Sequence, residues 1–452
     1  MKKSITKTIP VLLGLGLFIS PIVGAIDFGY GFFSSLRQSD NLNQSDNGNS
    51  GTAYDLGMRF GIGNNASNVI NYEIDGVLAT ADYTSDDLDR EYYRSLDGRF
   101  QYQAVDSNFG FIALEQLTQV PANRFATQET NNLRDINVYA ARPTYYIRLS
   151  GEDKINLYAT YIDFSAGENT LDATNNSKNE TMFSMDYAHR LNPITTITLV
   201  AEKSETDFDE AFNELTRTAD DFSQNDIFMR WETRGKTTSL RANLGQSEVT
   251  TDSGEKFDAD LLDINLSRVI NRTQSINLGF RKGFDSLLGF NLDANQININ
   301  SQSVNFNTAL ETKQHSLTYE YRDISFSSSL RIFSAELSSV QVQNNETRKG
   351  AEFNISYSLS HLLKNPLESN IQFQYSRTDS EFSTQDVVSL NNLVENFEIR
   401  FNYSINRKLD LYARVEKRVS ESQNVGEAMV DSSANNFVLG VTYTPVKRRK
   451  AL

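Results

Sequence analysis

Apolar and polar residues alternate at every second position along much of this chain. In 397–403, Phe397, Ile399, Phe401 and Tyr403 alternate with Glu398, Arg400 and Asn402. The same period recurs in 56–62, 227–232, 371–376, 409–416 and 437–443. Because an extended strand points successive side chains to opposite faces, this pattern predicts many amphipathic β-strands.

The connections between these strands also alternate, in length. Short turns, such as 63–66, 151–153, 271–273, 311–313 and 406–408, follow longer polar loops, such as 38–49, 118–134, 167–178, 205–221 and 380–392. Counting in this way predicts about twenty strands (18–22), with 296–339 the ambiguous stretch. Pro143 falls inside one predicted strand, where we expect a bulge or the strand's end.

Charged residues on the polar face decide between a soluble sandwich and a membrane barrel. A dry sandwich core could not hold so many charges without a large desolvation cost, whereas the wet lumen of a barrel can. The residues expected to line this lumen are Arg59, Arg99, Arg148, Arg230, Glu232, Arg241, Asp263, Arg281, Glu398, Arg400, Asp410, Arg414 and Glu416.

The predicted fold is therefore all-β, a transmembrane antiparallel up-and-down β-barrel. Closing the sheet pairs every backbone amide inside the bilayer, where an unpaired one costs several kcal/mol. Barrels of this kind place short turns in the periplasm and longer loops outside, so both termini should be periplasmic. We expect one barrel domain from 26 to 446, followed by a basic tail, 447–452.

The N-terminus has the features of an export signal. Three lysines in the first seven residues precede the apolar run 9–23, which ends in the small-residue box Val23-Gly24-Ala25. This predicts a Sec-type signal peptide, 1–25, cut after Ala25. The alternative is an uncleaved anchor, but the run is short for a spanning helix of ~20 residues, and Pro10 and Pro21 bracket it.

Composition narrows the compartment and the partners. The chain has no cysteine, and its 20 Tyr and 28 Phe against one Trp suit the aromatic girdles of a barrel. Removing the three signal lysines leaves 43 − 3 = 40 basic residues against 58 acidic ones, which disfavours nucleic acid as a partner. We expect outer-membrane lipid, lipopolysaccharide and the barrel assembly machinery as partners in a Gram-negative bacterium.

One stretch carries a family resemblance. The strand Phe28-Gly29-Tyr30-Gly31-Phe32-Phe33, followed by Ser39-Asp40-Asn41 and a long series of amphipathic strands, resembles the outer-membrane β-barrel porins that accompany exopolysaccharide and exosortase gene clusters. This resemblance implies a porin-like channel and a polysaccharide as the exported cargo. The chain departs from many such barrels at its end, because Tyr443 is followed by nine further residues, 444–452.

The lumenal charges leave two functional interpretations open. Opposed charges on adjacent strands can polarise a water channel and select solutes, or they can form a self-neutralising network that only fills the interior. The width of a barrel of about twenty strands favours a passive channel, with a polysaccharide conduit as the specific hypothesis. The alternative is a non-conducting structural or adhesive barrel whose loops bind glycans.

Catalysis is the third hypothesis. A barrel hydrolase needs a histidine base near a nucleophile, and the chain has three histidines, His189, His315 and His361. All three are expected beside periplasmic turns, which is the wrong side for a hydrolase of surface substrates. We therefore predict no enzyme, no cofactor and no metal site.

Overall fold

The structure is a computed structural model whose described part consists almost entirely of strands. It describes residues 27–41, 50–64, 69–84, 90–103, 107–121, 133–167, 177–208, 221–285, 309–340, 345–360, 363, 369–383, 389–424 and 430–446. The predicted signal peptide, the basic tail and His361 lie outside these residues. Within the described part, no helix is long and apolar enough to cross a membrane.

Twenty strands make up one sheet in the described residues. They are β1 (Asp27–Ser39), β2 (Gly51–Asn64), β3 (Ile70–Tyr83), β4 (Glu91–Gln103), β5 (Phe109–Pro121), β6 (Leu133–Arg148), β7 (Asp153–Ala166), β8 (Lys178–Asn192), β9 (Thr195–Phe208), β10 (Phe222–Arg234), β11 (Thr238–Thr251), β12 (Lys256–Asn271), β13 (Gln274–Asp285), β14 (Leu310–Arg322), β15 (Phe326–Ser339), β16 (Asn345–Ser358), β17 (Asn370–Ser383), β18 (Ser389–Asn406), β19 (Leu409–Asn424) and β20 (Val430–Val446).

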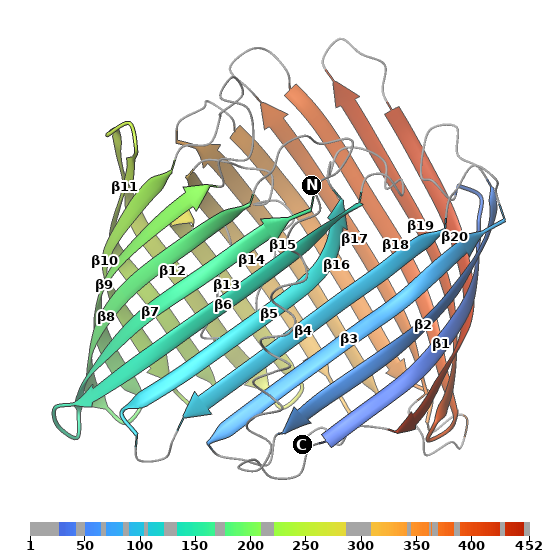
Figure 1. The fold of residues 1–452 in the computed structure, drawn as a ribbon, viewed down its shortest axis with the longest axis horizontal. Helices are drawn as coiled ribbons and strands as arrows, with labels where there is room; N and C mark the ends of the chain where they lie inside the picture. The colour runs from blue at the N-terminus through green and yellow to red at the C-terminus, as the bar shows by residue number, and fades with distance from the viewer. Residues whose placement is uncertain are drawn as a thin grey trace, which may run out of the picture.

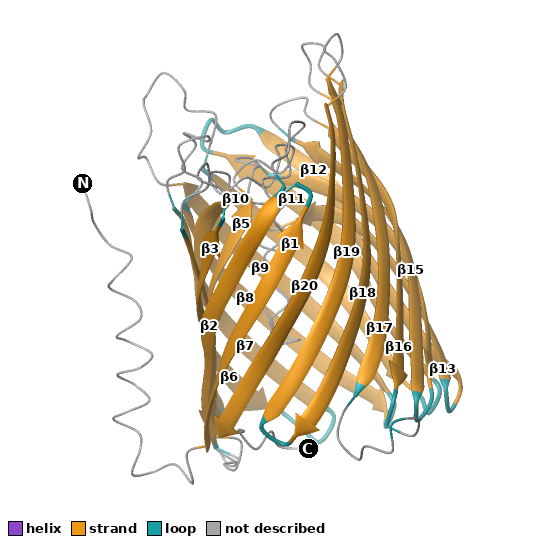
Figure 2. Ribbon diagram, turned by 90° about the vertical axis from the view of Figure 1, so that its right-hand side faces the viewer, coloured by secondary structure: helices purple, strands orange, loops and turns teal. Residues whose placement is uncertain are grey.

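The sheet closes on itself as an up-and-down barrel. Each strand pairs antiparallel with its neighbours in sequence, and β1 pairs with β20, with Leu36 opposite Leu439. The strands are tilted relative to the barrel axis (Figures 1 and 2), as closure of a sheet into a barrel requires. The prediction of an antiparallel barrel of about twenty strands is confirmed.

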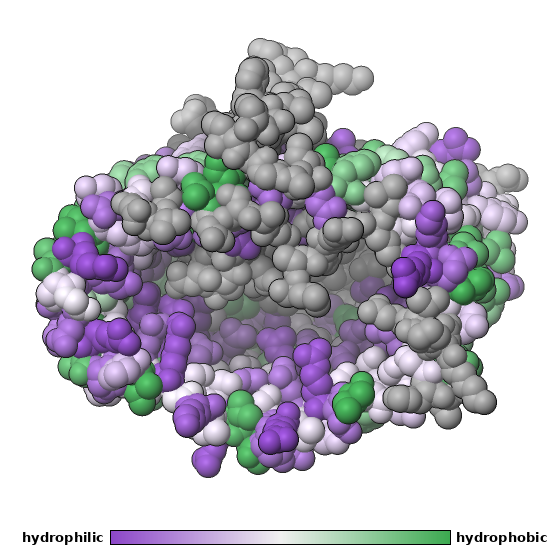
Figure 3. Space-filling view, turned by 90° about the horizontal axis from the view of Figure 1, so that it is seen from below, coloured by the Kyte–Doolittle hydropathy of each residue, from purple (hydrophilic) through white to green (hydrophobic). Residues whose placement is uncertain are grey.

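The alternation seen in the sequence sorts side chains between the two faces of this sheet. Ile399 pairs with Val415 on one face, and the next pair, Arg400 with Arg414, lies on the other. Val415 is 47% exposed on the outer wall. Viewed along the axis, the barrel is hollowed, and the described part of its inner wall is largely hydrophilic (Figure 3). The outer face is therefore the lipid-facing one.

On the outer wall, an apolar belt ends on the long-loop side at a row of charged residues on β12 to β19. Aromatic residues, among them Tyr145, Trp231 and Tyr443, mark the opposite edge of the belt near the short turns. We call this row of charged residues the outer collar. It comprises Asp260, Lys282, Lys313, Glu336, Lys349, Arg377, Glu395 and Lys417, one outward residue from each strand.

Two details of the predicted strands are wrong. The stretch 311–313, predicted as a short periplasmic turn, lies inside β14 near the long-loop rim, and the short turn is at 323–325 instead. Pro143 neither ends β6 nor forms a bulge. The β6–β7 ladder skips Arg142 and Pro143 without a change of register, because proline has no N–H to donate, and β6 continues to Arg148.

Candidate functional site

The structure places every residue predicted to line the lumen on the inward face of the sheet. Each of them occupies the face opposite the exposed apolar residues of its strand. These inward residues are Arg59, Arg99, Arg148, Arg230, Glu232, Arg241, Asp263, Arg281, Glu398, Arg400, Asp410, Arg414 and Glu416. They do not form one site, because they fall into separate groups around the barrel.

One group runs across β8 to β13. Arg230 Nη1 lies 3.8 Å from Asp186 Oδ2, and Arg230 Nε donates to Asn243 Oδ1 at 3.2 Å. The Asn243 side chain in turn donates to Asp263 Oδ2 at 3.2 Å, and Asp263 faces Arg281 across the ladder. Positive and negative groups alternate along this chain of contacts, while Glu202 and Asp226 on the same inward face add further carboxylates near Arg230.

A second group lies on β18 and β19, where two arginines face each other. Arg400 and Arg414 are cross-strand partners on the inner wall. Glu398 bridges them, with Oε1 3.1 Å from Arg400 Nη2 and Oε2 3.7 Å from Arg414 Nη1, and Glu416 lies 3.9 Å from Arg414. Opposed like charges destabilise a ladder, so the Glu398 carboxylate compensates for the Arg400–Arg414 pair.

The remaining predicted residues have local partners. The guanidinium of Arg59 lies 5.0 Å from the ring centre of Phe33, and Arg99 donates a hydrogen bond to Gln101 Oε1 at 3.0 Å. Arg241 Nε lies 3.9 Å from Glu232 Oε1. Asp410 accepts a hydrogen bond from Ser404 Oγ at 2.6 Å. Arg148 faces Lys154 across the ladder and lines, together with Glu232, a groove of about 420 Å³ at the short-turn rim.

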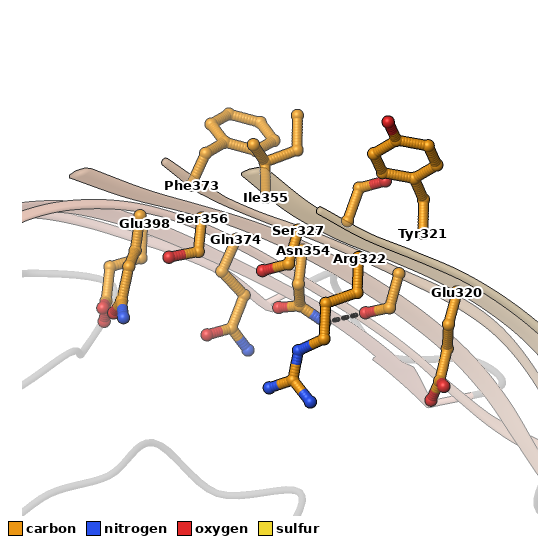
Figure 4. A pocket seen from close by; sticks show the side chains of 13 residues that line it. Glu320, Tyr321, Arg322, Ser327, Asn354, Ile355, Ser356, Phe373, Gln374 and Glu398 are labelled. Atoms are coloured by element: carbon orange, nitrogen blue, oxygen red, sulfur yellow. Dashed lines mark hydrogen bonds between the residues drawn. The ribbon is translucent and has the colours of Figure 1, made fainter. Parts of the chain in front are cut away.

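A groove of uncharged polar side chains lies on the inner wall of β14 to β18, near the short-turn rim. It has a volume of about 440 Å³, and Asn354 Nδ2 donates to Ser329 Oγ at 3.3 Å within it (Figure 4). We call it the amide–serine groove. Its inward residues are Ser327, Ser329, Asn354, Ser356, Gln372 and Gln374, with Glu320, Arg322 and Glu398 at its ends.

Local alternation decides which side chains line this groove. Along β15, Ser327 and Ser329 point inward while Ser328 and Leu330 point outward. Tyr321, Ile355 and Phe373 project from the opposite side of the sheet, so the aromatic rings near the groove face away from the lumen (Figure 4). The groove can therefore offer hydrogen-bond donors and acceptors to a ligand, but no stacking surface.

The pattern of inward charges did not predict this groove, because most of its inward residues are uncharged. Serine at 327 and 329, and asparagine, glutamine and serine at every second position of 370–376, were the available signal. Assigning a face to β15 also required the register of 296–339, the stretch that the sequence left ambiguous. Only strand pairing places Ser329 beside Asn354.

The inner wall also contains apolar patches that alternation did not predict. Leu114, Ile136, Val138, Ile162 and Phe164 form a buried cluster on β5 to β7, and the register puts them on the same face as the lumenal residue Arg142. Both faces of these strands carry apolar residues, so a period of two could not tell which face is inward. The lumen wall is therefore hydrophilic only in part.

The two described histidines lie on separate strands, β8 and β14. His189 lies on the outer wall near a short turn, as predicted, and its Nδ1 is 2.7 Å from Asp153 Oδ1. Ser150 Oγ donates to that same carboxylate, not to the imidazole. The prediction for His315 is wrong, because it lies on the outer wall within β14, 4.9 Å from the ring of Phe280, and not beside a periplasmic turn.

Comparisons with known proteins give the fold alone. No family model matches the chain, and no curated protein matches its sequence. Among solved structures, a mutant of the ferric enterobactin receptor PfeA from Pseudomonas aeruginosa is similar, with a TM-score of 0.50 and 12% identity over 92% of this chain and 80% of that one. The FrpB iron transporter from Neisseria meningitidis gives a TM-score of 0.45 at 10% identity, over 92% of this chain and 81% of that one. The chain thus has the fold of outer-membrane barrels.

Proposed function

We propose that this chain is a passive channel in the outer membrane of a Gram-negative bacterium, and that its cargo is an exported polysaccharide. The shared fold of outer-membrane barrels supports the location. Ferric enterobactin is the ligand in the name of PfeA, and we do not assign it to this chain. The amide–serine groove is the observation that carries the proposal for the cargo.

The chemistry of the groove suits a polyhydroxylated chain. Each sugar hydroxyl both donates and accepts a hydrogen bond, and so do the side chains of Ser329, Asn354 and Gln374. A net hydrogen bond contributes only about 0.5–1.5 kcal/mol, so a glycan can exchange partners along the wall without being trapped. Conduction needs such weak, repeated binding.

The paired charges support passive transport of the same cargo. Glu398 stands at one end of the groove and is held between Arg400 and Arg414. Glu416 lies 3.9 Å from Arg414, so two carboxylates balance two guanidinium groups, and this part of the wall has no net charge that would repel or trap a weakly acidic polymer.

Single-channel recording tests the proposal. The purified full chain in planar bilayers should give discrete conductance steps, and a neutral oligosaccharide should block them transiently. Replacing Gln372 and Gln374 with Leu should weaken the block about tenfold, since roughly one to two hydrogen bonds are lost. Ile371→Leu, on the outer face of the same strand, is the matched control and should leave the block unchanged.

Two results would overturn the proposal. If folded protein inserts many times without any conductance, the chain is not a channel, and the adhesive alternative is favoured. Binding of glycan to the non-conducting barrel would then support that alternative. Conductance with equal oligosaccharide block in the Gln372/Gln374 variant keeps the channel but removes the groove as the glycan contact.

A further inference from the structure

A groove on the outer wall crosses from the apolar belt into the outer collar. It extends over β12 to β17 and has a volume of about 860 Å³. Its apolar part is formed by Leu266, Leu278, Phe280, Leu317 and Ile332. Three of these, Leu278, Leu317 and Ile332, are between 41% and 49% exposed, so the groove opens toward lipid. This site is separate from the lumen and does not depend on what the lumen conducts.

Small outward residues form the floor of the groove. Ser334 lies opposite His315 on β14, and Ala351 lies opposite Ile332 on β15. A serine and an alanine between bulky neighbours leave a depression in a wall that long side chains would otherwise fill. An acyl chain can fill such a depression and cover the apolar side chains around it.

The other end of the groove is charged. Lys349 and Arg377 line it and belong to the outer collar, with Lys349 near the long-loop end of β16. Asp379 lines the same end and faces Lys349 across the ladder, and Arg377 Nη1 lies 3.1 Å from Glu395 Oε1 on β18. The charged end of the lining thus has two basic side chains and one carboxylate.

We propose that this groove binds a phosphorylated, acylated glycolipid of the outer leaflet, namely the lipid A part of lipopolysaccharide. An acyl chain occupies the apolar part, and a phosphate contacts Lys349 and Arg377. Guanidinium binds phosphate through two parallel N–H donors, and ammonium binds it as a point charge. The long-loop rim is the outer one, so the charged end of the groove is level with the headgroups of that leaflet.

The ion pair between Glu395 and Arg377 provides a separate test of phosphate binding. Arg377 already holds this carboxylate, so an incoming phosphate must share or displace it. Replacing Glu395 with Gln frees the guanidinium, and lipid A should then bind more tightly, by about threefold or more. Removing a carboxylate would have no such effect on a groove that binds acyl chains alone.

Native mass spectrometry of the full chain in an uncharged detergent tests the site with lipid A as the probe. Lys349→Gln combined with Arg377→Gln should weaken binding at least tenfold, and dephosphorylated lipid A should show the same loss on the unaltered protein. Lys203→Gln is the matched control. Lys203 is an outward lysine of β9, 53% exposed and paired with Glu205 at 2.6 Å, and its removal should leave binding unchanged.

A second variant guards against a folding defect. Ala351→Leu fills the floor and keeps both cations, and it should weaken lipid A binding while circular dichroism still shows a folded barrel.

Equal binding of lipid A to the Lys349/Arg377 variant and to the unaltered protein overturns the proposal. Equal affinity for phosphatidylglycerol and lipid A overturns the assignment to a glycolipid.

Discussion

The carboxylate of Asp40 accepts two hydrogen bonds from Asn435, across the seam where the barrel closes. The backbone N–H of Asn435 lies 2.7 Å from Asp40 Oδ1, and its side-chain amide lies 2.6 Å from Oδ2. Next to it, Asn41 Nδ2 donates to the carbonyl of Ser433 at 3.0 Å, and Ser39 Oγ accepts from the Asn41 N–H at 3.1 Å. The tripeptide Ser39-Asp40-Asn41 thus extends the β1–β20 contact beyond the end of β1.

Removing the Asp40 carboxylate should loosen this seam. Asp40→Ala should lower the free energy of unfolding by about 1–2 kcal/mol, because two hydrogen bonds to a charged acceptor are lost at a solvent-exposed site. Urea unfolding in lipid vesicles measures the change. Glu205→Ala removes an exposed carboxylate that pairs only at the surface with Lys203, and it should cost less than about 0.5 kcal/mol. Equal effects of the two substitutions would contradict a role for Asp40 in closure.

The same contact should depend on pH. Partial desolvation would raise the pKa of Asp40, but the hydrogen bonds from the Asn435 side chain and backbone outweigh it and hold the pKa below its ordinary value of 3.8. A lowered folded-state pKa means that the stabilisation is present above the unfolded-state pKa and is lost as the pH falls through the folded-state value. The difference in unfolding free energy between the wild-type protein and Asp40→Ala should therefore be full at pH 7 and shrink below pH 3.8.

Glu398 should control the charge selectivity of the lumen. Glu398→Gln leaves Arg400 and Arg414 opposed on the inner wall with one counter-charge fewer. We expect reversal potentials in a salt gradient to shift toward anions, with a chloride-to-potassium permeability ratio roughly twofold higher. Glu336→Gln, which removes a carboxylate from the outer wall, should leave the potential unchanged. An unchanged reversal potential for Glu398→Gln would mean that the ion path does not pass this residue.

Two glycines should differ strongly in how stability responds to an added methyl group. A Cβ on Gly245 would clash with the backbone oxygen of Ile227 and lie 2.5 Å from the Cα of Phe228, so β10 itself would have to move. Gly245→Ala should destabilise the barrel by about 2 kcal/mol or more. Gly98→Ala meets nothing closer than 3.6 Å and should change stability by less than about 0.5 kcal/mol. Thermal unfolding in detergent compares the two, and similar melting temperatures would contradict the close β10–β11 packing.

The sequence alone determined the strand content, the closed barrel and the sorting of residues such as Val415 and Arg400 onto opposite faces. It could do so because a strand has a period of two and a bilayer accepts only one arrangement of that period, apolar outside with every amide paired. The turn at 323–325 was missed because serine-rich alternation in 325–339 has no strongly apolar face to set the register.

Contacts between strands far apart in sequence were decided by the tertiary structure. Asn435 meets Asp40 only because the last strand returns to the first, and Ser329 meets Asn354 only in one register of β15 and β16. The outer groove depends on Ser334 and Ala351 coming to adjacent positions on separate strands. Hydropathy is a property of each position, whereas a groove or a hydrogen bond is a property of a pair, and pairing is set by the register of the whole closed sheet.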